Sequence, residues 1–181
     1  MIIALTGTPG TGKTSVSKIL IKNDFKVVDL NLISKQKGYI IEKDIKRDTN
    51  IVDVNGLNKY INDNYSSSDI VFVEGHLSHL LKCVDKIIIL RCHPDKLRKN
   101  LGLRKWSKTK IKENIEAEIL DVILCEAVDL HPQNNIFEID ATYQSINEVS
   151  KIIIDMVKKR FKNIKEYKIG HIDWSEEILK L

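Results

Sequence analysis

Near the start of this 181-residue chain, the stretch GTPGTGKTS at positions 7–15 concentrates glycines, hydroxyl side chains and one lysine. Gly10 and Gly12 lack a side chain, so the backbone can curl there and direct successive N–H groups into one concavity. A helix that begins directly after such a loop adds the positive end of its dipole, which favours a polyphosphate. The residues therefore predict a phosphate-binding loop, and an ordinary glycine turn with a chance lysine is the alternative.

The spacing of these residues fits a nucleotide-binding pattern. Gly7, Gly12, Lys13 and Thr14 match GxxxxGK[ST], in which the lysine bridges the β- and γ-phosphates and the hydroxyl binds Mg²⁺. The apolar run IIAL before the loop predicts a short buried strand, and TSVSKILI after it predicts the first turns of a helix. Strand, loop and helix in this order give the pattern its functional meaning, so we expect a P-loop.

A second group of reactive residues ends a later apolar run, in the stretch IVFVEGHLSHLL. A carboxylate at the end of a strand beside a phosphate loop is placed to hold Mg²⁺ or its water shell, so Glu74 is a candidate for that role. A strand-end acid that merely faces water is the alternative. His76 can titrate near neutral pH. His79 is three residues further along, but no additional metal ligand is evident nearby, so we expect it to be a packing or surface residue.

The segment 91–112 is strongly basic, with nine lysines and arginines against one acidic residue. Such an imbalance is expected where a segment lies over a triphosphate and neutralises its charge during transfer. Arg104 is the strongest candidate, because GLRKWS interrupts two helical patterns and is suited to a mobile lid. Arg91 and Arg98 are weaker candidates. A surface that provides solubility and some RNA affinity is the alternative.

Strand and helix patterns alternate along the chain. After the first strand, further strands are predicted within FKVVDL, DIVFVEG, DKIIILRC and NNIFEID, and helices at about 55–64, 94–102, 107–126 and 143–162. Continuous apolar strands with intervening helices predict a parallel sheet covered on both faces. The expected fold class is α/β, with residues 1–181 forming one P-loop domain.

Composition limits the location and the partners of the chain. No stretch is long and apolar enough to span a bilayer, and the start lacks the pattern of a signal peptide. Cys83, Cys92 and Cys125 form no CxxC pair, so we expect reduced thiols and a cytoplasmic protein. The net charge of +4 permits an anionic partner without requiring one.

Four stretches together resemble the archaeal and eukaryotic nuclear adenylate kinase family, and its archaeal branch in particular: LTGTPGTGKTS, RDTNIVDV, VFVEGHLSHLL and LRCHPDKLRKNLGLRKWSKTKIKENIEAEI. The resemblance runs over about residues 1–141. It implies a nucleoside monophosphate kinase-like fold with a five-stranded parallel sheet flanked by helices and with short NMP-binding and lid segments. It also implies ATP and Mg²⁺ as cofactors and an ATPase that acts in small ribosomal subunit maturation.

The resemblance also assigns roles to residues. ATP phosphates would contact Gly10, Gly12, Lys13, Thr14 and Ser15; the metal would be held by Thr14 and Glu74; the lid, about 102–112, would bring Arg104 to the nucleotide; and Glu74 and His76 match an acidic-x-His pair associated with Mg²⁺ and hydrolysis. The AMP-side segment would span about 29–53, with Asp29, Lys35, Arg47, Asp48 and Asp53 as candidates.

Two features depart from the family pattern. Glu74 replaces the aspartate of many eukaryotic members, which implies a longer or water-mediated metal contact. The stretch NLISKQKGY after the second predicted strand lacks the arginine that grips the AMP phosphate in adenylate kinases. Lys35 or Arg47 would have to replace it, and a lysine is a point charge without the bidentate fork of arginine.

Three functions therefore remain open. The first is a nucleotide kinase that converts ATP and AMP into two ADP, with slow ATP hydrolysis when AMP is absent. The second is an ATP-driven assembly factor for a small-subunit ribosomal protein and an rRNA precursor. It would use the basic stretch 151–168 as a surface beside the active site, with solvated helix and tail residues as the alternative. The third is a small-molecule kinase of similar size. The oligomeric state is left open.

Overall fold

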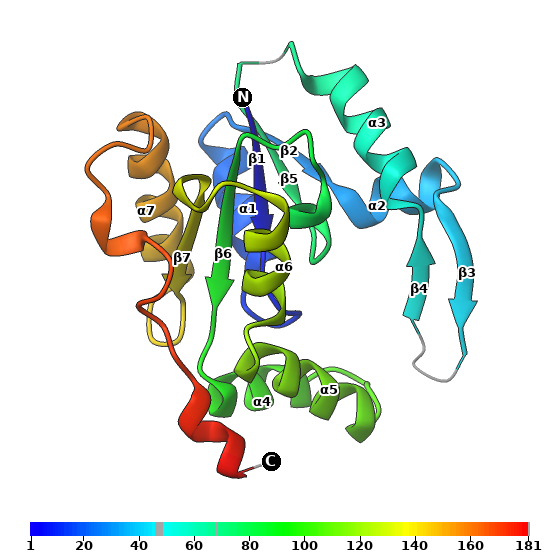
Figure 1. Cartoon of the computed structure of the whole chain (residues 1–181), viewed down its shortest axis with the longest axis vertical. Helices are drawn as coiled ribbons and strands as arrows, with labels where there is room; N and C mark the ends of the chain where they lie inside the picture. Colours follow the sequence, from blue (N-terminus) through cyan, green and yellow to red (C-terminus); the bar gives the residue numbers. More distant parts are fainter. Residues whose placement is uncertain (46–48, 68, 181) are drawn as a thin grey trace.

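The chain folds around a parallel five-stranded sheet, as the sequence predicts (Figure 1). The computed structural model describes all residues except 46–48, 68 and 181. The strand order is β2-β5-β1-β6-β7, with β1 Ile2–Thr6, β2 Lys26–Asp29, β5 Val71–Glu74, β6 Lys86–Arg91 and β7 Ile136–Asp140. Each strand falls within its predicted segment, except that β1 extends one residue beyond IIAL. All strand pairs in this sheet are parallel.

Helices cover both faces of the sheet, because successive residues of each buried strand point to opposite sides. Ile3 and Leu5 of β1 pack with α1 (Lys13–Lys22) and α7 (Ile146–Lys158). Ile2 and Ala4 face the other way and join the core beneath α3 (Val54–Tyr65) and α6 (Val122–Leu130). Both faces of the sheet are therefore buried, which explains the continuous apolar character of its strands.

Two structures project beyond the carboxyl ends of the strands, where ligands bind in open α/β sheets. On one side lie α4 (Pro94–Gly102) and α5 (Lys108–Ile119), joined by residues 103–107. On the other side lie α2 (Leu30–Gln36) and the antiparallel hairpin of β3 (Ile40–Asp44) and β4 (Thr49–Val52) (Figure 1). The helix α2 and the hairpin fall inside the predicted NMP-binding segment, but the sequence patterns did not identify them as elements.

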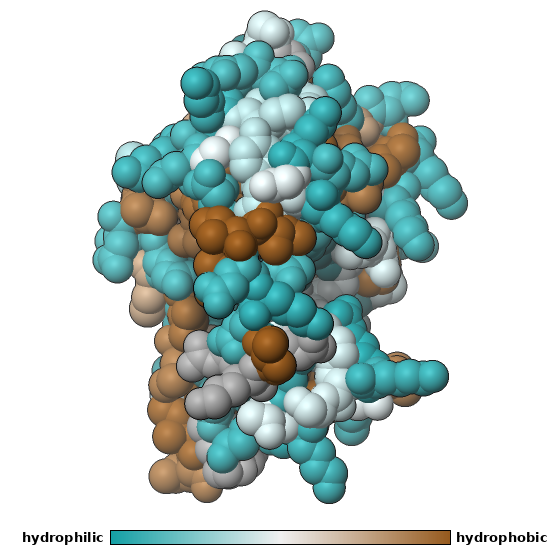
Figure 2. Space-filling model, turned by 90° about the vertical axis from the view of Figure 1, so that its right-hand side faces the viewer, coloured by the Kyte–Doolittle hydropathy of each residue, from teal (hydrophilic) through white to brown (hydrophobic). Residues whose placement is uncertain are grey.

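The hairpin carries apolar side chains that are exposed to solvent. Ile41, Ile45 and Ile51 are 68%, 86% and 47% exposed. Figure 2 looks onto this side of the molecule and shows apolar surface set among hydrophilic side chains. The hairpin therefore projects from the core, and these side chains do not pack against it.

The prediction of a single helix over 107–126 is wrong, because the structure divides this region into α5 and α6. At the break, Asp121 adopts a left-handed backbone conformation with φ of 54°. Its carboxylate and the Glu118 carboxylate both accept hydrogen bonds from the buried guanidinium group of Arg91. These contacts hold the chain at the break. The spacing of apolar residues does not predict such an ion pair, so the break was not predicted.

The last helix begins and ends inside its predicted range of 143–162. The Ser145 hydroxyl accepts a hydrogen bond from Glu148 N–H, and the Glu148 side chain bonds back to Ser145 N–H, so a capping box starts α7. The helix ends at Lys158, and the following Arg160 and Phe161 have positive φ angles of 51° and 57°. Beyond it, the chain returns past β7, with a bridge between Phe137 and Lys168.

The basic stretch at the end of α7 does not lie beside the active site, contrary to the prediction. In a parallel α/β fold each helix runs back toward the amino ends of the strands, and Figure 1 shows α7 ending near the N-terminus of the chain, away from α4 and α5. The exposed basic residues there are Lys158, Lys159, Arg160, Lys162 and Lys165. Among the described residues, no helix is both long and apolar enough to cross a membrane.

Candidate active site

The glycine loop connects β1 to α1 and is open to an anion at the start of the helix. Gly12 occupies the N-cap position with φ of 101° and provides no side-chain hydrogen bond to the first turn. The N–H groups of that turn therefore point outward without a side-chain cap. Together with the helix dipole they form an anion-binding concavity, as the sequence predicts for a P-loop.

The glycine loop is held from the side by α4. The Asn100 amide donates a hydrogen bond to Gly10 O at 3.0 Å. A Cβ atom at Gly10 would lie 2.9 Å from Leu97 Cδ1 and 3.0 Å from Leu101 Cδ2, and the residue has φ of 100°. Only glycine satisfies both the backbone conformation and the close approach of α4.

The Lys13 side chain folds into the loop. Its ammonium group donates to Gly7 O at 2.7 Å and to Thr8 O at 3.1 Å, and the residue is 7% exposed. Burial lowers the pKa of Lys13 from 10.5 to about 8; nearby Glu74 opposes this shift, whereas Arg104 adds to it. An arriving phosphate would supply the negative charge that this buried cation lacks.

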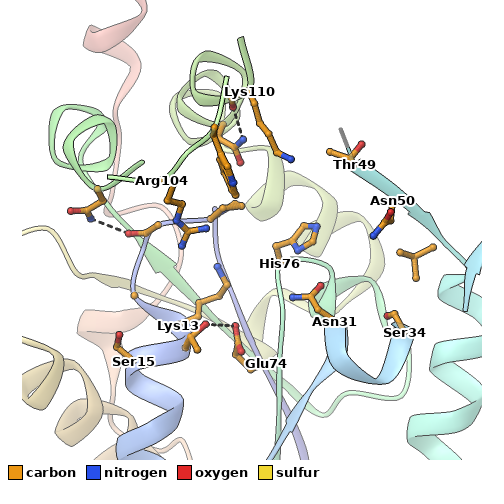
Figure 3. A pocket seen from close by; sticks show the side chains of 18 of the residues that line it. Lys13, Ser15, Asn31, Ser34, Thr49, Asn50, Glu74, His76, Arg104 and Lys110 are labelled. Atoms are coloured by element: carbon orange, nitrogen blue, oxygen red, sulfur yellow. Dashed lines mark hydrogen bonds between the residues drawn. The ribbon is translucent and has the colours of Figure 1, made fainter. Parts of the chain in front are cut away.

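A pair of oxygen ligands suited to Mg²⁺ lies next to Lys13. The Thr14 hydroxyl donates to Glu74 Oε1 across 3.5 Å, and β2–β5 pairing places Asp29 beside Glu74 (Figure 3). Burial raises the pKa of Glu74, Lys13 opposes that rise, and Asp29 contributes to it. Mg²⁺ in kinases takes one or two protein oxygens together with phosphate oxygens and water, so Thr14 and Glu74 fit this ion. The described part of the chain contains no cluster of three or more His, Cys, Asp or Glu residues that could hold a metal by itself.

The two histidines after β5 have different surroundings. His76 lines the cavity, and desolvation together with the charges of Lys13, His79 and Lys110 lowers its pKa from 6.5 to about 4. It is therefore neutral at physiological pH. His79 is fully buried, with Nδ1 at 3.1 Å from Thr6 Oγ1 and Nε2 at 2.9 Å from Glu126 Oε2. Its contacts agree with the packing role expected for His79.

Arg91, a weaker candidate for nucleotide contact, is a buried structural residue instead. Its guanidinium group bonds to Glu118, Asp121 and Glu138 and is 2% exposed. Glu118 also accepts from Thr8 Oγ1 at 2.5 Å and from Cys92 N–H at 3.0 Å. This network connects the glycine loop, β6 and α5, so it fixes the helix that follows the lid loop relative to the phosphate site.

Above the loop, the predicted lid brings two cations and an aromatic ring to the cavity. Arg104 and Trp106 come from the connection between α4 and α5, and Lys110 from the first turn of α5. The Arg104 guanidinium carbon and the Lys110 ammonium nitrogen each lie 4.8 Å from the centre of the Trp106 ring. Arg98, by contrast, is exposed on α4 and does not line the cavity.

The cavity between the lid and the hairpin has a volume of about 860 Å³. One wall contains the glycine loop, Glu74, His76 and the lid. The opposite wall is formed by side chains of α2 and the hairpin: Asn31, Ser34, Lys35, Ile40, Thr49, Asn50 and Val52. Figure 3 shows Asn31, Thr49 and Asn50 across the cavity from Lys13 and Arg104. Among the described residues of this second wall, the cation that lines the cavity is Lys35.

The other predicted AMP-side residues have different positions. Asp29 caps α2 by accepting from Leu32 N–H at 3.0 Å, and Asp53 caps α3 by accepting from Gly56 N–H at 2.9 Å. Neither is among the residues that line the cavity. Arg47 and Asp48 lie outside the described residues.

Sequence reasoning missed the uncharged polar residues of the cavity. Asn31, Ser34, Asn50, Asn100 and Asn114 all line it. Single amides and hydroxyls have no characteristic spacing. Asn31, Ser34 and Asn50 do lie inside the predicted NMP-binding segment, whereas Asn100 and Asn114 lie just outside the predicted lid. Trp106 and Lys110 did fall inside the predicted lid of 102–112, where their residue types were a usable signal.

Comparisons with known proteins agree with this architecture. The family described as "AAA domain" matches residues 3–121. A protein of Methanococcus maripaludis named "Putative adenylate kinase" is 37% identical over 187 residues, covering 100% of this chain and 99% of that protein. A protein of Archaeoglobus fulgidus with the same name is 44% identical over 179 residues, covering 98% and 94%.

Solved structures with low sequence identity share the fold. Shikimate kinase from Bacteroides thetaiotaomicron aligns with a TM-score of 0.54 at 15% identity, covering 87% of this chain and 98% of that chain. A gluconokinase from Sinorhizobium meliloti aligns with a TM-score of 0.57 at 14% identity, covering 90% and 94%. With its P-loop kinase fold and these full-length archaeal relatives, the chain belongs to the archaeal protein family whose members are named "Putative adenylate kinase".

Proposed function

We propose that the protein is a nucleotide kinase that transfers the γ-phosphoryl group of ATP to AMP and produces two ADP. The observation that carries this proposal is the two-walled cavity. A glycine loop with its lysine forms one wall, and a separate polar wall with Lys35 faces it across the same space. A hydrolase needs room for a water molecule beside the triphosphate, whereas this cavity offers a second substrate-sized wall. The names of the archaeal relatives support AMP as the acceptor.

The donor side is assigned to ATP and Mg²⁺. The loop N–H groups and Lys13 would hold the β- and γ-phosphates, with Gly10, Gly12 and Ser15 around them. Thr14 and Glu74 would hold Mg²⁺, which supplies neutralisation of the phosphate charge when it is bound. Lys13 would exchange its two carbonyl partners for phosphate oxygens, a change that restores full charge to an ammonium group whose pKa is lowered by burial.

The acceptor side is assigned to a nucleoside monophosphate. Lys35 provides a charge for the monophosphate, and the amides of Asn31 and Asn50 can donate to and accept from the edge of a base. Lysine binds phosphate as a point charge, so this wall fixes the orientation of the acceptor less rigidly than an arginine fork would. We therefore expect a relaxed preference among monophosphates with AMP favoured.

The transfer itself needs little covalent help from the protein. An oxygen of the AMP phosphate forms a bond to the γ-phosphorus of ATP. The bond from that phosphorus to the oxygen bridging the β- and γ-phosphates breaks, so the former ATP leaves as ADP and the former AMP becomes the second ADP. The AMP oxygen is already ionised, so no proton has to be removed by a base. The chain contributes alignment of the two phosphates and cations around the charge that moves between them.

Slow ATP hydrolysis is expected when AMP is absent. His76 lines the cavity and is neutral, so its ring can accept a hydrogen bond from water that occupies the acceptor position. Hydrolysis is thus a side reaction of the same site.

A second candidate function is the assembly of the small ribosomal subunit. It is favoured by the exposed basic residues at the end of α7, which form a cluster on the side away from the cavity. Phosphate contacts of such a cluster release counterions, so binding to rRNA would weaken steeply with salt. Retention of rRNA or a small-subunit ribosomal protein at low salt, with and without ATP and Mg²⁺, tests it. If neither is retained, the free kinase is the better description.

The kinase proposal is tested by an acceptor screen. ADP formation from ATP and Mg²⁺ would be measured with AMP, dAMP, CMP, UMP, shikimate, gluconate or no acceptor. The expected result is the highest rate with AMP, slower rates with other monophosphates and the slowest rate without an acceptor. A faster reaction with either of the two non-nucleotide acceptors would favour a small-molecule kinase, and equal rates with and without AMP would favour an ATPase.

A further inference from the structure

The lid holds two cations over one aromatic ring. Arg104 and Lys110 are each 4.8 Å from the centre of the Trp106 ring, within the range of a cation–π interaction. All three residues line the cavity. The ring is itself anchored, because it packs against the small core formed by Cys92, Leu97, Leu101, Ile115 and Ile119.

The two cations lie over different parts of the cavity floor. In Figure 3, Arg104 is on the side of Lys13, whereas Lys110 is on the side of His76 and Thr49. The electrostatics agree: the charge of Arg104 lowers the pKa of Lys13, and the charge of Lys110 lowers the pKa of His76. Arg104 therefore faces the donor phosphates, and Lys110 faces the region between the donor and the second wall.

Lys110 is held at the start of α5 by its backbone. Its N–H donates to the Ser107 hydroxyl at 3.1 Å, which caps α5, and α5 is tied to the glycine loop through Glu118 and Thr8. Arg104 belongs to the connection before the helix. The charge of Lys110 thus extends from a helix whose position relative to the phosphate site is fixed.

We infer that Lys110 is a second catalytic cation, which neutralises the phosphoryl group as it moves toward the acceptor, and that Trp106 is the positioning residue for both lid cations. The inference rests on the proposed function. When the acceptor is AMP, two anionic phosphates must approach each other, so a cation between them lowers the barrier to transfer. When the acceptor is water, that second anion is absent and the same cation contributes less.

The test compares two reactions of the full-length protein, transfer to AMP and ATP hydrolysis, in Lys110→Ala. We expect kcat for transfer to fall about 100-fold, the scale for losing one group that stabilises transition-state charge, and hydrolysis to fall by a smaller factor. Lys110→Arg keeps the charge and should recover most of the transfer rate. Lys108→Ala is the matched control, because Lys108 is exposed on the same helix and does not line the cavity.

Trp106 is tested by replacing its ring. Trp106→Leu keeps an apolar side chain against the lid core but removes the cation–π contacts, whereas Trp106→Phe keeps a ring. We expect transfer to fall more in Trp106→Leu than in Trp106→Phe, at similar melting temperatures of the two variants. Equal losses in both, with unchanged melting temperatures, would reduce Trp106 to a packing residue.

The outcomes separate this inference from the proposed function. If the wild-type protein transfers phosphate to AMP but Lys110→Ala lowers transfer and hydrolysis by the same factor, or no more than Lys108→Ala does, the role of Lys110 is wrong while the kinase assignment stands. If the wild-type protein does not transfer phosphate to AMP at all, both fail together.

Discussion

In the structure, the ammonium group of Lys13 donates hydrogen bonds to two carbonyl oxygens, at the place proposed for phosphate oxygens. The arrangement has a consequence for pH dependence, because burial lowers the pKa of this lysine to about 8. An ordinary lysine, with a pKa of 10.5, would keep its charge well above that pH.

We predict that kcat/KM for ATP falls as the pH rises through about 8, since this quantity follows the ionisation of the free enzyme and the charged form of Lys13 is lost there. Steady-state kinetics from pH 6 to 10 provide the measurement. Lys13→Ala should lower turnover about 100-fold or more without unfolding the protein. Lys13→Arg retains its charge over the whole range, so its residual activity should lack the fall near pH 8. A fall of the same size in Lys13→Arg would assign it to another group.

For His76 we predict that His76→Ala lowers ATP hydrolysis more than transfer to AMP. The reason is that a neutral imidazole can orient attacking water, whereas the AMP oxygen is positioned by its own binding site. Because the pKa of His76 is about 4, hydrolysis by the wild-type protein should show no loss attributable to this ring between pH 5 and 8. Parallel rate measurements decide the question, and equal losses in the two reactions would remove its special role with water.

At the scale of elements, the cavity depends on how α5 is fastened. The Glu118 carboxylate bonds to Arg91 and Cys92 of the β6 end and to Thr8 of the glycine loop, at 3% exposure. A surface pair on the same helix, Lys112 with Glu116, makes a contact of 3.5 Å in solvent.

We predict that Glu118→Ala lowers the free energy of unfolding by about 3 kcal/mol, because it removes one partner of a buried ion pair and leaves a loop hydroxyl and an N–H unsatisfied. Glu116→Ala is the control and should change it by less than about 1 kcal/mol, as exposed pairs do. Urea denaturation of both variants measures the difference. Similar small effects at the two positions would mean that the network does not hold α5.

Elements that follow from periodicity were predictable, and elements fixed by ion pairs were not. The five strands and α4 lie where apolar runs and helical spacing place them, because the sheet is buried on both faces. The break between α5 and α6 depends on Arg91, whose three carboxylate partners are 27, 30 and 47 residues away in the chain. The glycines, the lysine and the strand-end acid predicted the donor wall. On the acceptor wall Lys35 was a candidate, but most of the polar residues there are amides and hydroxyls, which follow no spacing rule.

At the scale of the whole molecule, the C-terminal segment returns to the end that carries the cavity. Trp174 packs against the core of α4 and α5, and its ring lies 5.0 Å from that of His93 at the start of α4. Trp174 thus docks the C-terminal segment on this core. The C-terminal segment therefore packs against α4 and α5, the two helices that flank the lid loop (Figure 1).

We predict that Trp174→Ala lowers the free energy of unfolding by about 2 kcal/mol, the value for removing one large half-buried side chain, and raises KM for ATP because α4 contacts the glycine loop through Asn100. Thermal unfolding and steady-state kinetics test the two effects. Leu179→Ala is the control, because Leu179 is 93% exposed in the same segment. A loss of stability without any change in KM would separate the C-terminal segment from the nucleotide site.

If both walls of the cavity serve one transfer reaction, the γ-phosphoryl group of ATP must appear on AMP, and an isotope label follows it there. ATP labelled in its γ-phosphoryl group would be incubated with unlabelled AMP, Mg²⁺ and the protein, and the products separated. We predict label in the β-position of ADP, with little free phosphate while AMP is present, and loss of both products in Lys13→Ala. Label that appears only as inorganic phosphate, at the same rate with and without AMP, would contradict it.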